Sequence, residues 1–398
     1  MSAAPLIEPR DRTGDLASLF RLQAPDRHLA TDGLLSCLPA GPASTLGARV
    51  DAFFASPRGG PDLLVGALPF DPHRDDALYQ PARFAVPGRA VPPGAPGPWG
   101  TTAELPPARD YADAVARCVA TLKAAPDGAA TLKAAPDGAD ALRKVVLARG
   151  LRVESTSSID PHVLAARLGS DASVTTYVVP LPVAAGEAPA WLVGATPELL
   201  VSRRGCDVVS HPLAGSARRS GDAAEDQRRT EALLASDKDL REHRFVVEAI
   251  LDGLAPLCSR LQAPPRPSLQ ATATMLHLAT RITGTLKDAT VSSATLAGIL
   301  HPTPAVCGTP RLPALQAIRE LEPFDRGFYA GAVGWTNAAG DGDWYVAIRC
   351  ARVQGNAMHL FAGAGIVADS QAALEVDETA AKFMALRNAI GIDDARAA

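Results

Sequence analysis

The amino-acid sequence predicts an α+β fold, and three observations support this prediction. Short apolar runs separated by Gly or Pro fill residues 174–210. Apolar residues at helical spacing are concentrated in separate stretches, the longest of which begins at Asp226. Glycine-rich turns between alternating runs occur in residues 327–367 and are typical of antiparallel hairpins. Strands and helices therefore occur in separate groups, without the regular alternation that builds a parallel sheet.

The composition favours a globular protein that binds small molecules. The chain has 398 residues, of which 47% are hydrophobic, enough for a sizeable core. A net charge of −4, 5% aromatic residues and the lack of a Lys/Arg run argue against nucleic acid or a membrane surface as a partner. The N-terminus carries no apolar signal segment, and the six scattered cysteines form no C-x-x-C pair. We therefore expect a cytoplasmic protein with reduced thiols and no zinc site.

Local patterns in the first half of the chain predict two strands and two helices. Residues 1–50 are weakly patterned, and the Pro/Gly-rich residues 86–107 predict a connection without regular structure. The sequence TLKAAPDGA occurs twice, within residues 121–139, and this tandem duplication predicts a lengthened surface loop. The predicted elements are a strand at 63–70, a helix at 109–122, a strand at 144–155 and a helix at 161–168 that Asp160 caps.

The second half is predicted to combine short strands, one long helix and a meander. The long helix runs from Asp226 to Leu254 as a single apolar stripe. The predicted strands are 174–179, 191–195, 199–203, 207–210, 327–336, 344–353 and 357–367.

The chain between Leu360 and Phe383 combines a glycine turn with a charged helix. The strand ends in Gly363-Ala364-Gly365, where missing Cβ atoms allow other groups to approach the backbone. We expect Asp369 or Ser370 to cap the helix that follows. Glu375, Glu378 and Lys382 share one face of it. Taken alone, Glu378 and Lys382 also suit an ordinary solvated i,i+4 pair.

Common nucleotide-binding and hydrolase motifs are absent from the sequence. No G-x-G-x-x-G follows a predicted strand, and neither a P-loop, G-x-S-x-G nor H-E-x-x-H occurs. Ten other segments occur in one order from Leu142 to Ile390: KVVLAR, GATPELL, HPLAGS, SDKDLREH, LHLAT, HPTPAVCG, YAGAVGW, AIRCA, GAGIV and E-x-x-E-T-x-x-K. Together they are far more specific than any one of them.

These ten segments resemble the chorismate-utilising enzymes, a family that includes isochorismate, salicylate, anthranilate and aminodeoxychorismate synthases. The resemblance implies a single large α+β domain of two facing antiparallel sheets flanked by helices, with the active site in the cleft between them. It assigns residues 109–393 to the chorismate-binding catalytic region. Residues 1–108 would be a divergent N-terminal part of the same domain, and 394–398 a tail.

The resemblance also implies a Mg²⁺ site and two catalytic residues. Glu242 and Glu378 match the family's metal ligands, and hard oxygen ligands are what Mg²⁺ prefers. Asp239 precedes Glu242 by three residues, and Glu375 precedes Glu378 by three residues. These two carboxylates would contact the metal ion through bound water. Lys144 would be the general base that activates a water for attack at C2 of chorismate, and burial at a strand start could adapt it to that role.

Glu198 would be the general acid that protonates the departing C4 hydroxyl, which requires a partly apolar pocket. The substrate carboxylates would be held by side chains and backbone N–H groups together. The implied substrate-binding residues are Gly215, Ser216, His277, Arg349, Gly365 and Lys382.

Three positions select a branch of the family. Isochorismate and salicylate synthases resemble each other in having a lysine at the position of Lys144. Ala305 stands where salicylate synthases tend to have Thr, and the HPLAGS turn lacks the lysine of aminodeoxychorismate synthases. We therefore expect a monomeric isochorismate synthase that feeds 2,3-dihydroxybenzoate or siderophore biosynthesis, with chorismate and isochorismate as its small-molecule partners. A salicylate synthase, an anthranilate or aminodeoxychorismate synthase and a catalytically silent binding subunit remain alternatives.

Overall fold

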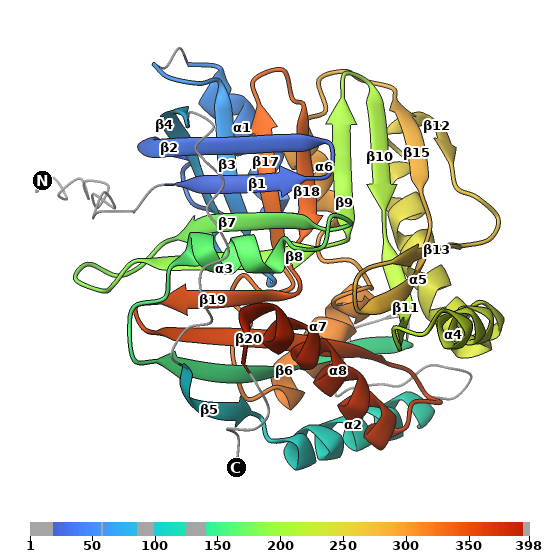
Figure 1. Cartoon of the computed structure of the whole chain (residues 1–398). Helices are drawn as coiled ribbons and strands as arrows, with labels where there is room; N and C mark the ends of the chain where they lie inside the picture. The colour runs from blue at the N-terminus through green and yellow to red at the C-terminus, as the bar shows by residue number, and fades with distance from the viewer. Residues whose placement is uncertain (1–18, 57–58, 86–98, 125–140, 393–398) are drawn as a thin grey trace, which may run out of the picture.

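The computed structural model describes residues 19–56, 59–85, 99–124 and 141–392, and antiparallel strands form its framework (Figure 1). Within these residues, seventeen strands join in one network and three form a small separate sheet. The strands of the network are β1 (Phe20–Ala24), β2 (Arg27–Cys37), β3 (Leu63–Leu68), β4 (Ala77–Phe84), β5 (Trp99–Leu105), β6 (Lys144–Ser155), β7 (Thr175–Leu181), β8 (Ala190–Thr196), β9 (Leu199–Arg204), β10 (Asp207–His211), β12 (Cys258–Gln262), β15 (Ile282–Leu286), β16 (Gly308–Thr309), β17 (Ala332–Asn337), β18 (Gly342–Val346), β19 (Cys350–Gln354) and β20 (Ala357–Ile366). The small sheet consists of β11 (Leu213–Arg218), β14 (Met275–Ala279) and β13 (Ser268–Ala271).

The pairing divides the network into two halves. One half runs from β6, which also pairs with β5 and β16, through β20, β19, β8, β7 and β1 to β2. The other runs from β4 through β3, β17, β18, β9, β10 and β15 to β12, and the β2–β4 pair joins the halves. In Figure 1 the first half lies across the view, whereas β9, β10, β17 and β18 stand upright.

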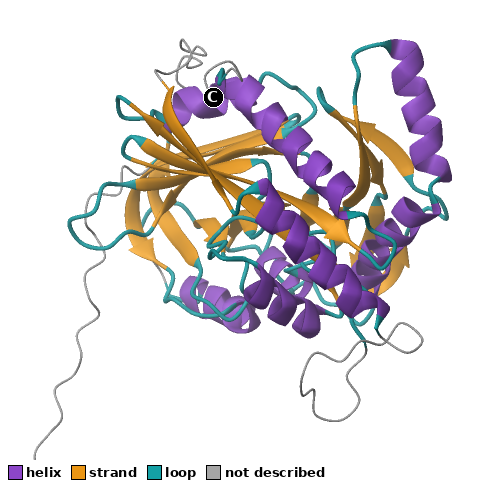
Figure 2. Cartoon of the chain, turned by 90° about the horizontal axis from the view of Figure 1, so that it is seen from below, coloured by secondary structure: helices purple, strands orange, loops and turns teal. Residues whose placement is uncertain are grey.

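The helices lie around the strands (Figure 2). They are α1 (Leu46–Phe54), preceded by a 3-10 turn at Ala43–Thr45, α2 (Ala108–Lys123), α3 (Pro161–Leu168), α4 (Ala223–Ala235), α5 (Asp237–Leu254), α6 (Ser293–Leu300), α7 (Arg311–Leu321) and α8 (Ala372–Ile390). α8 packs on β20, α3 packs on β7 and β8, and α6 packs on β9 and β18. None of these helices is long and apolar enough to cross a membrane.

The apolar side chains form a main core and two smaller clusters. The main core includes Leu64, Val145 and Trp344, which are almost fully buried. A second cluster lies under α3 and α8 and includes Leu360 and Phe383. The small sheet packs its own apolar side chains, Leu276 and Leu278, against Leu233 of α4. The small sheet therefore has an apolar cluster of its own and also contributes Ala214 of β11 to the main core.

The predicted α+β class is confirmed: the described chain forms one domain with large antiparallel sheets and helices around them. Helix α3 begins at Pro161, and the side chain of Asp160 accepts hydrogen bonds from the next two backbone N–H groups. Strand β6 has the predicted bounds. These elements follow from local sequence signals alone.

Several predicted elements differ in the structure. Residues 99–105 form β5, because β6 supplies their backbone hydrogen-bond partners; residues 86–98 lie outside the described chain. The predicted single helix from Asp226 is two helices, because Ser236 has extended backbone angles and caps α5 through the Asp239 N–H. Neither Asp369 nor Ser370 caps α8; Gln371 precedes it and makes no side-chain cap.

The weakly patterned first 50 residues contain β1, β2 and α1. Most of the duplication, residues 125–139, lies outside the described chain, as does the tail.

The predicted strand 344–353 is broken into β18 and β19. The first pairs with β17 and β9, and the second pairs with β20 and β8, so the chain passes here from one half of the network to the other. Arg349 lies at the crossing and has a φ of 50°, in the left-handed region that non-glycine residues rarely adopt. This unusual turn brings an arginine to the edge of both halves.

Candidate active site

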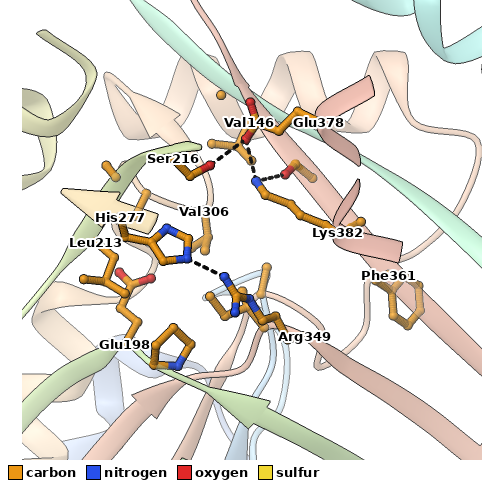
Figure 3. A pocket seen from close by; sticks show the side chains of 18 of the residues that line it. Val146, Glu198, Leu213, Ser216, His277, Val306, Arg349, Phe361, Glu378 and Lys382 are labelled. Carbon is orange, nitrogen blue, oxygen red and sulfur yellow. Dashed lines mark hydrogen bonds and ion pairs between the residues drawn. The ribbon is translucent and has the colours of Figure 1, made fainter. Parts of the chain in front are cut away.

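A cavity lies between strands β6 and β20 on one side and the small sheet with α5 on the other (Figure 3). Helix α8 and the loops around residues 197, 305, 330 and 348 complete its walls. The lining side chains with chemical functions are Glu198, Ser216, Glu242, His277, Tyr329, Arg349, Glu378 and Lys382. Strands of the first half, the small sheet, helices α5 and α8 and several connecting loops therefore contribute to one site.

One end of the cavity is built on α8. Lys382 Nζ is 2.7 Å from Glu378 Oε1 and donates to the Gly363 carbonyl oxygen, also at 2.7 Å. Ser216 Oγ, on β11, donates to the same Glu378 oxygen at 3.3 Å (Figure 3). Burial opposes ionisation of Glu378, but the charge and hydrogen bond of Lys382, the charge of Lys238 and the Ser216 hydrogen bond together lower the pKa of this carboxyl. Glu378 is therefore an anion that faces the cavity.

Glu242 lies beside Lys144 and Gly365. Lys144, at the start of β6, is completely buried, and its Nζ lies 3.0 Å from Glu242 Oε1. It does not line the cavity but stands behind Glu242. A Cβ on Gly365 would overlap Glu242 Oε1 and lie 3.1 Å from Lys144 Cε. Only glycine at this position leaves room for the Glu242 carboxylate.

Four carboxyl groups from two helices gather at this end. Asp239 and Glu242 come from α5, and Glu375 and Glu378 come from α8. Burial raises the pKa of Asp239, and the charges of Glu242 and Glu378 raise it further. Burial also raises the pKa of Glu375, although its Oε1 accepts from Lys238 Nζ at 2.8 Å.

This donor set fits Mg²⁺. Glu242 and Glu378 both line the cavity, whereas Asp239 and Glu375 lie behind them. A divalent cation would relieve the repulsion among these carboxylates, and carboxylate oxygens are the ligands that Mg²⁺ prefers. Among the described residues, no three His, Cys, Asp or Glu side chains stand close enough to hold a metal by themselves. A Mg²⁺ ion here would therefore keep waters or take substrate oxygens as further ligands.

Glu198 lies at the other end of the cavity, in the turn between β8 and β9. Its side chain is buried, and burial raises the pKa of its carboxyl to about 8. A hydrogen bond from the Leu213 N–H and the charges of Lys144, Arg349 and Lys382 oppose this rise without cancelling it. At neutral pH Glu198 is therefore protonated and can donate a proton into the cavity.

Arg349 and His277 lie next to Glu198 (Figure 3). Burial, and then the charges of Arg349 and Lys382, lower the pKa of His277 well below its usual value, so its neutral ring accepts from Arg349 through Nε2. Arg349 Nη1 also donates to Thr272 Oγ1 at 3.3 Å. Burial lowers the pKa of Arg349 only to about 10, so the guanidinium keeps its charge at neutral pH. It is a cation directed at the cavity, suited to a carboxylate.

The structure brings most of the predicted site residues together. The residues that line the cavity are Glu198, Gly215, Ser216, Glu242, His277, Ala305, Arg349, Gly365, Glu378 and Lys382. Lys144, Asp239 and Glu375 lie just outside it, behind Glu242 and Glu378. One end carries carboxylates and lysines, and the other carries a neutral acid beside an arginine.

Sequence reasoning missed the apolar walls of the cavity. Tyr329 stacks on Phe361 with ring centroids 4.7 Å apart, and both rings line it. Further apolar wall residues include Val146, Leu213, Val306, Ala330, Ile348 and Leu386. Most of these lie inside the quoted motifs, but a buried apolar residue in a strand gives no local sign of facing a cavity rather than the core.

Comparisons with known proteins identify relatives of the whole chain. A family model described as "Chorismate binding enzyme" matches residues 131–391. Isochorismate synthase DhbC of Bacillus subtilis is 40% identical over 389 residues, with 94% of each chain covered. The vibriobactin-specific isochorismate synthase of Vibrio cholerae is 40% identical over 83% of this chain and 80% of its own.

The fold has matches among solved structures as well. The crystal structure of a putative 2,3-dihydroxybenzoate-specific isochorismate synthase from Bacillus anthracis superposes with a TM-score of 0.84. It is 38% identical in sequence, and the match covers 96% of this chain and 98% of that one.

Proposed function

The chain belongs to the chorismate-binding enzymes, and from this premise we propose that it converts chorismate to isochorismate. The reaction adds a water at C2, expels the C4 hydroxyl and shifts the ring double bonds, so that the product is an isomer of the substrate. The relatives that match nearly the whole chain carry this activity in their names, and the cavity holds an acid, cations and carboxylates that suit a dianionic substrate.

The burial of the Glu198 side chain in the cavity wall is the observation that carries the proposal. A C4 hydroxyl leaves as water only if an acid gives it a proton, and an ordinary glutamic acid is ionised at neutral pH. Burial raises the pKa of Glu198 to about 8, so its proton is available at neutral pH. Glu198 therefore acts as the general acid.

Lys144 is the proposed general base. A lysine takes a proton only in its neutral form, and here the nitrogen is 3.0 Å from the Glu242 carboxylate. Lys144 has to leave this partner before its nitrogen can take a proton from a water in the cavity.

The remaining residues hold the substrate and the metal. Glu242 and Glu378 would bind Mg²⁺, and the ion would supply positive charge for a carboxylate of chorismate. Arg349 and Lys382 would hold the substrate's anionic groups, together with Ser216 and the N–H groups around Gly215 and Gly365. His277 is neutral and lines the pocket beside Arg349.

We assign isochorismate as the final product. Ala305 presents only a methyl group to the cavity, at the position where salicylate synthases tend to have a hydroxyl. The relative from Bacillus anthracis is described as 2,3-dihydroxybenzoate-specific, which supports 2,3-dihydroxybenzoate formation as the use of the product.

The test is an assay of the purified protein with chorismate and Mg²⁺, with and without EDTA, in which chromatography separates isochorismate, salicylate and anthranilate. Isochorismate as the single product, lost with EDTA, is the expected result. Salicylate formed at neutral pH faster than isochorismate alone decays would refute the choice made from Ala305. No turnover would refute the enzymatic function.

A further inference from the structure

Arg349 depends on a hairpin for its position. Its guanidinium contacts Thr272 Oγ1 and His277 Nε2, which belong to the turn between β13 and β14 and to β14 itself. The backbone of Arg349 has a φ of 50°, a conformation that L-residues rarely adopt without support from their surroundings. The direction of this side chain into the cavity is therefore set by its partners on the hairpin.

The hairpin is held by its own small sheet and by two loops of the first half. Within the small sheet, β14 pairs with β11, and Arg219 donates through its N–H to the Thr274 carbonyl oxygen at 2.9 Å and through Nη1 to the Thr272 carbonyl oxygen at 3.1 Å. The apolar side chains of the hairpin, Leu269, Leu276 and Leu278, pack in a cluster with Leu233. Beyond the cavity residues, two hydrogen bonds join the hairpin to the loops that follow β8 and precede β7. Gln270 Nε2 donates to the Pro197 carbonyl oxygen at 3.4 Å, and the Ala273 N–H donates to Asp171 Oδ2 at 2.6 Å.

Asp171 is the stronger of these two attachments. It lies between α3 and β7, outside every motif of the sequence, and is partly buried. Its other oxygen, Oδ1, accepts from the N–H of Ser173 at 2.9 Å and from its hydroxyl at 2.6 Å, which holds the carboxylate in a fixed direction. The Ala273 N–H that it holds is next in sequence to Thr272, the partner of Arg349.

Asp171 is also a counter-charge for Arg349. The attraction of Asp171 is the largest one that acts on the buried guanidinium, ahead of that of Glu198. Conversely, burial opposes ionisation of Asp171, but hydrogen bonds from Ser173 and Ala273 and the charge of Arg349 hold its pKa below the usual value. Asp171 is therefore ionised, whereas Glu198 is neutral.

We propose that Asp171 is a positioning residue for substrate binding: by holding the β13–β14 turn, it keeps Thr272 and His277 in place and so directs Arg349 into the cavity. The role of Arg349 in holding a substrate carboxylate rests on the proposed function. Asp171 does not touch the cavity and acts on the substrate only through these partners.

The test compares Asp171→Ala with Asp171→Asn. The amide oxygen of Asn can still accept from the Ala273 N–H, with its NH2 group in place of the oxygen that accepts from Ser173, whereas Ala removes both acceptors. We expect Asp171→Ala to raise the KM for chorismate about tenfold, equivalent to about 1.4 kcal/mol, with kcat changed by about twofold or less. The KM of Asp171→Asn is expected to stay within about threefold of the wild-type KM, because a single hydrogen bond contributes only about 0.5–1.5 kcal/mol.

Asp288→Ala is the matched control. Asp288 Oδ1 accepts from the N–H and the hydroxyl of Thr290, at 2.8 and 2.7 Å, in the same local turn, but it makes no bond to the hairpin. The KM of the Asp288→Ala variant for chorismate should equal that of the wild type.

Three results would overturn the positioning role: an unchanged KM in Asp171→Ala, an Asn variant as impaired as the Ala variant, or an equal rise in KM in Asp288→Ala. Calorimetric binding of chorismate to the same variants keeps this test separate from the proposed function. If the wild type binds chorismate without turnover, the enzymatic function fails, while a tenfold weaker Kd in Asp171→Ala still supports the role of Asp171.

Discussion

Replacing Glu198 with Gln should remove activity and increase stability at the same time. Gln keeps the shape of the side chain and can accept from the Leu213 N–H, but its amide has no acidic proton to transfer to a leaving group. Loss of a general acid typically costs a factor of about 10² to 10⁴ in rate, and we expect kcat to fall within that range. Chorismate binding should change little, because the side chain keeps its size.

The gain in stability follows from the pKa of Glu198. The carboxyl has an ordinary pKa of 4.5 in the unfolded chain and about 8 in the folded protein. Folding therefore takes up a proton between these pH values, and the wild type loses stability as the pH rises from 4.5 to about 8. Each pH unit above 4.5 lowers the free energy of unfolding by about 1.4 kcal/mol, and the total loss at pH 7 is about 3 kcal/mol. The Gln variant takes up no proton and avoids this cost.

Two measurements test this reasoning together. Thermal unfolding between pH 5 and 9 should show a difference in melting temperature that grows with pH and reaches roughly 5 °C at pH 7. Wild-type kcat should fall about tenfold per pH unit above pH 8, as Glu198 loses its proton, and the residual activity of the variant should lack this decline. Glu320→Gln, at an exposed position on α7, is the control. An active Gln variant, or one whose stability follows the wild type at every pH, would refute a protonated Glu198.

Three further substitutions test the other end of the cavity. Lys144→Ala should abolish hydration and leave the chorismate Kd within a few-fold of wild type, and turnover near the wild-type rate would exclude the lysine as base. Glu242→Gln should raise the Mg²⁺ concentration needed for half-maximal activity by about tenfold or more, since a charged ligand is lost; an unchanged Mg²⁺ titration would place the metal elsewhere. Gly365→Ala should displace the Glu242 carboxylate and reduce Mg²⁺-dependent activity about 100-fold, a factor typical of misplaced catalytic groups, whereas Gly59→Ala, at a glycine with open space around it, should have no effect.

Local signals in the sequence predicted individual elements well. The Asp160-Pro161 pair marks the start of α3, because the aspartate accepts from the first free N–H groups and the proline has no N–H that needs an acceptor. Ser236 shows where such a signal was overlooked. The apolar stripe continues across it, yet its side chain caps α5 and ends the preceding helix.

Elements that depend on distant partners could not be predicted in this way. Strand β5 follows a Pro/Gly-rich segment and exists because β6 supplies its hydrogen bonds. The run 344–353 alternates like one strand, but β18 and β19 pair in different halves of the network. Asp171 lies in no motif, and its contact with Ala273 joins segments about a hundred residues apart along the chain.

The sequence by itself determined the α+β class and, through ten segments in one order, the family and the residues that meet in the cavity. The tertiary structure alone decided the state of those residues. Glu198 is protonated because burial outweighs three distant cations, and Glu242 faces Lys144 because Gly365 leaves space for its carboxylate. Protonation and side-chain direction depend on burial and on charges contributed by remote parts of the chain, and no local pattern contains that information.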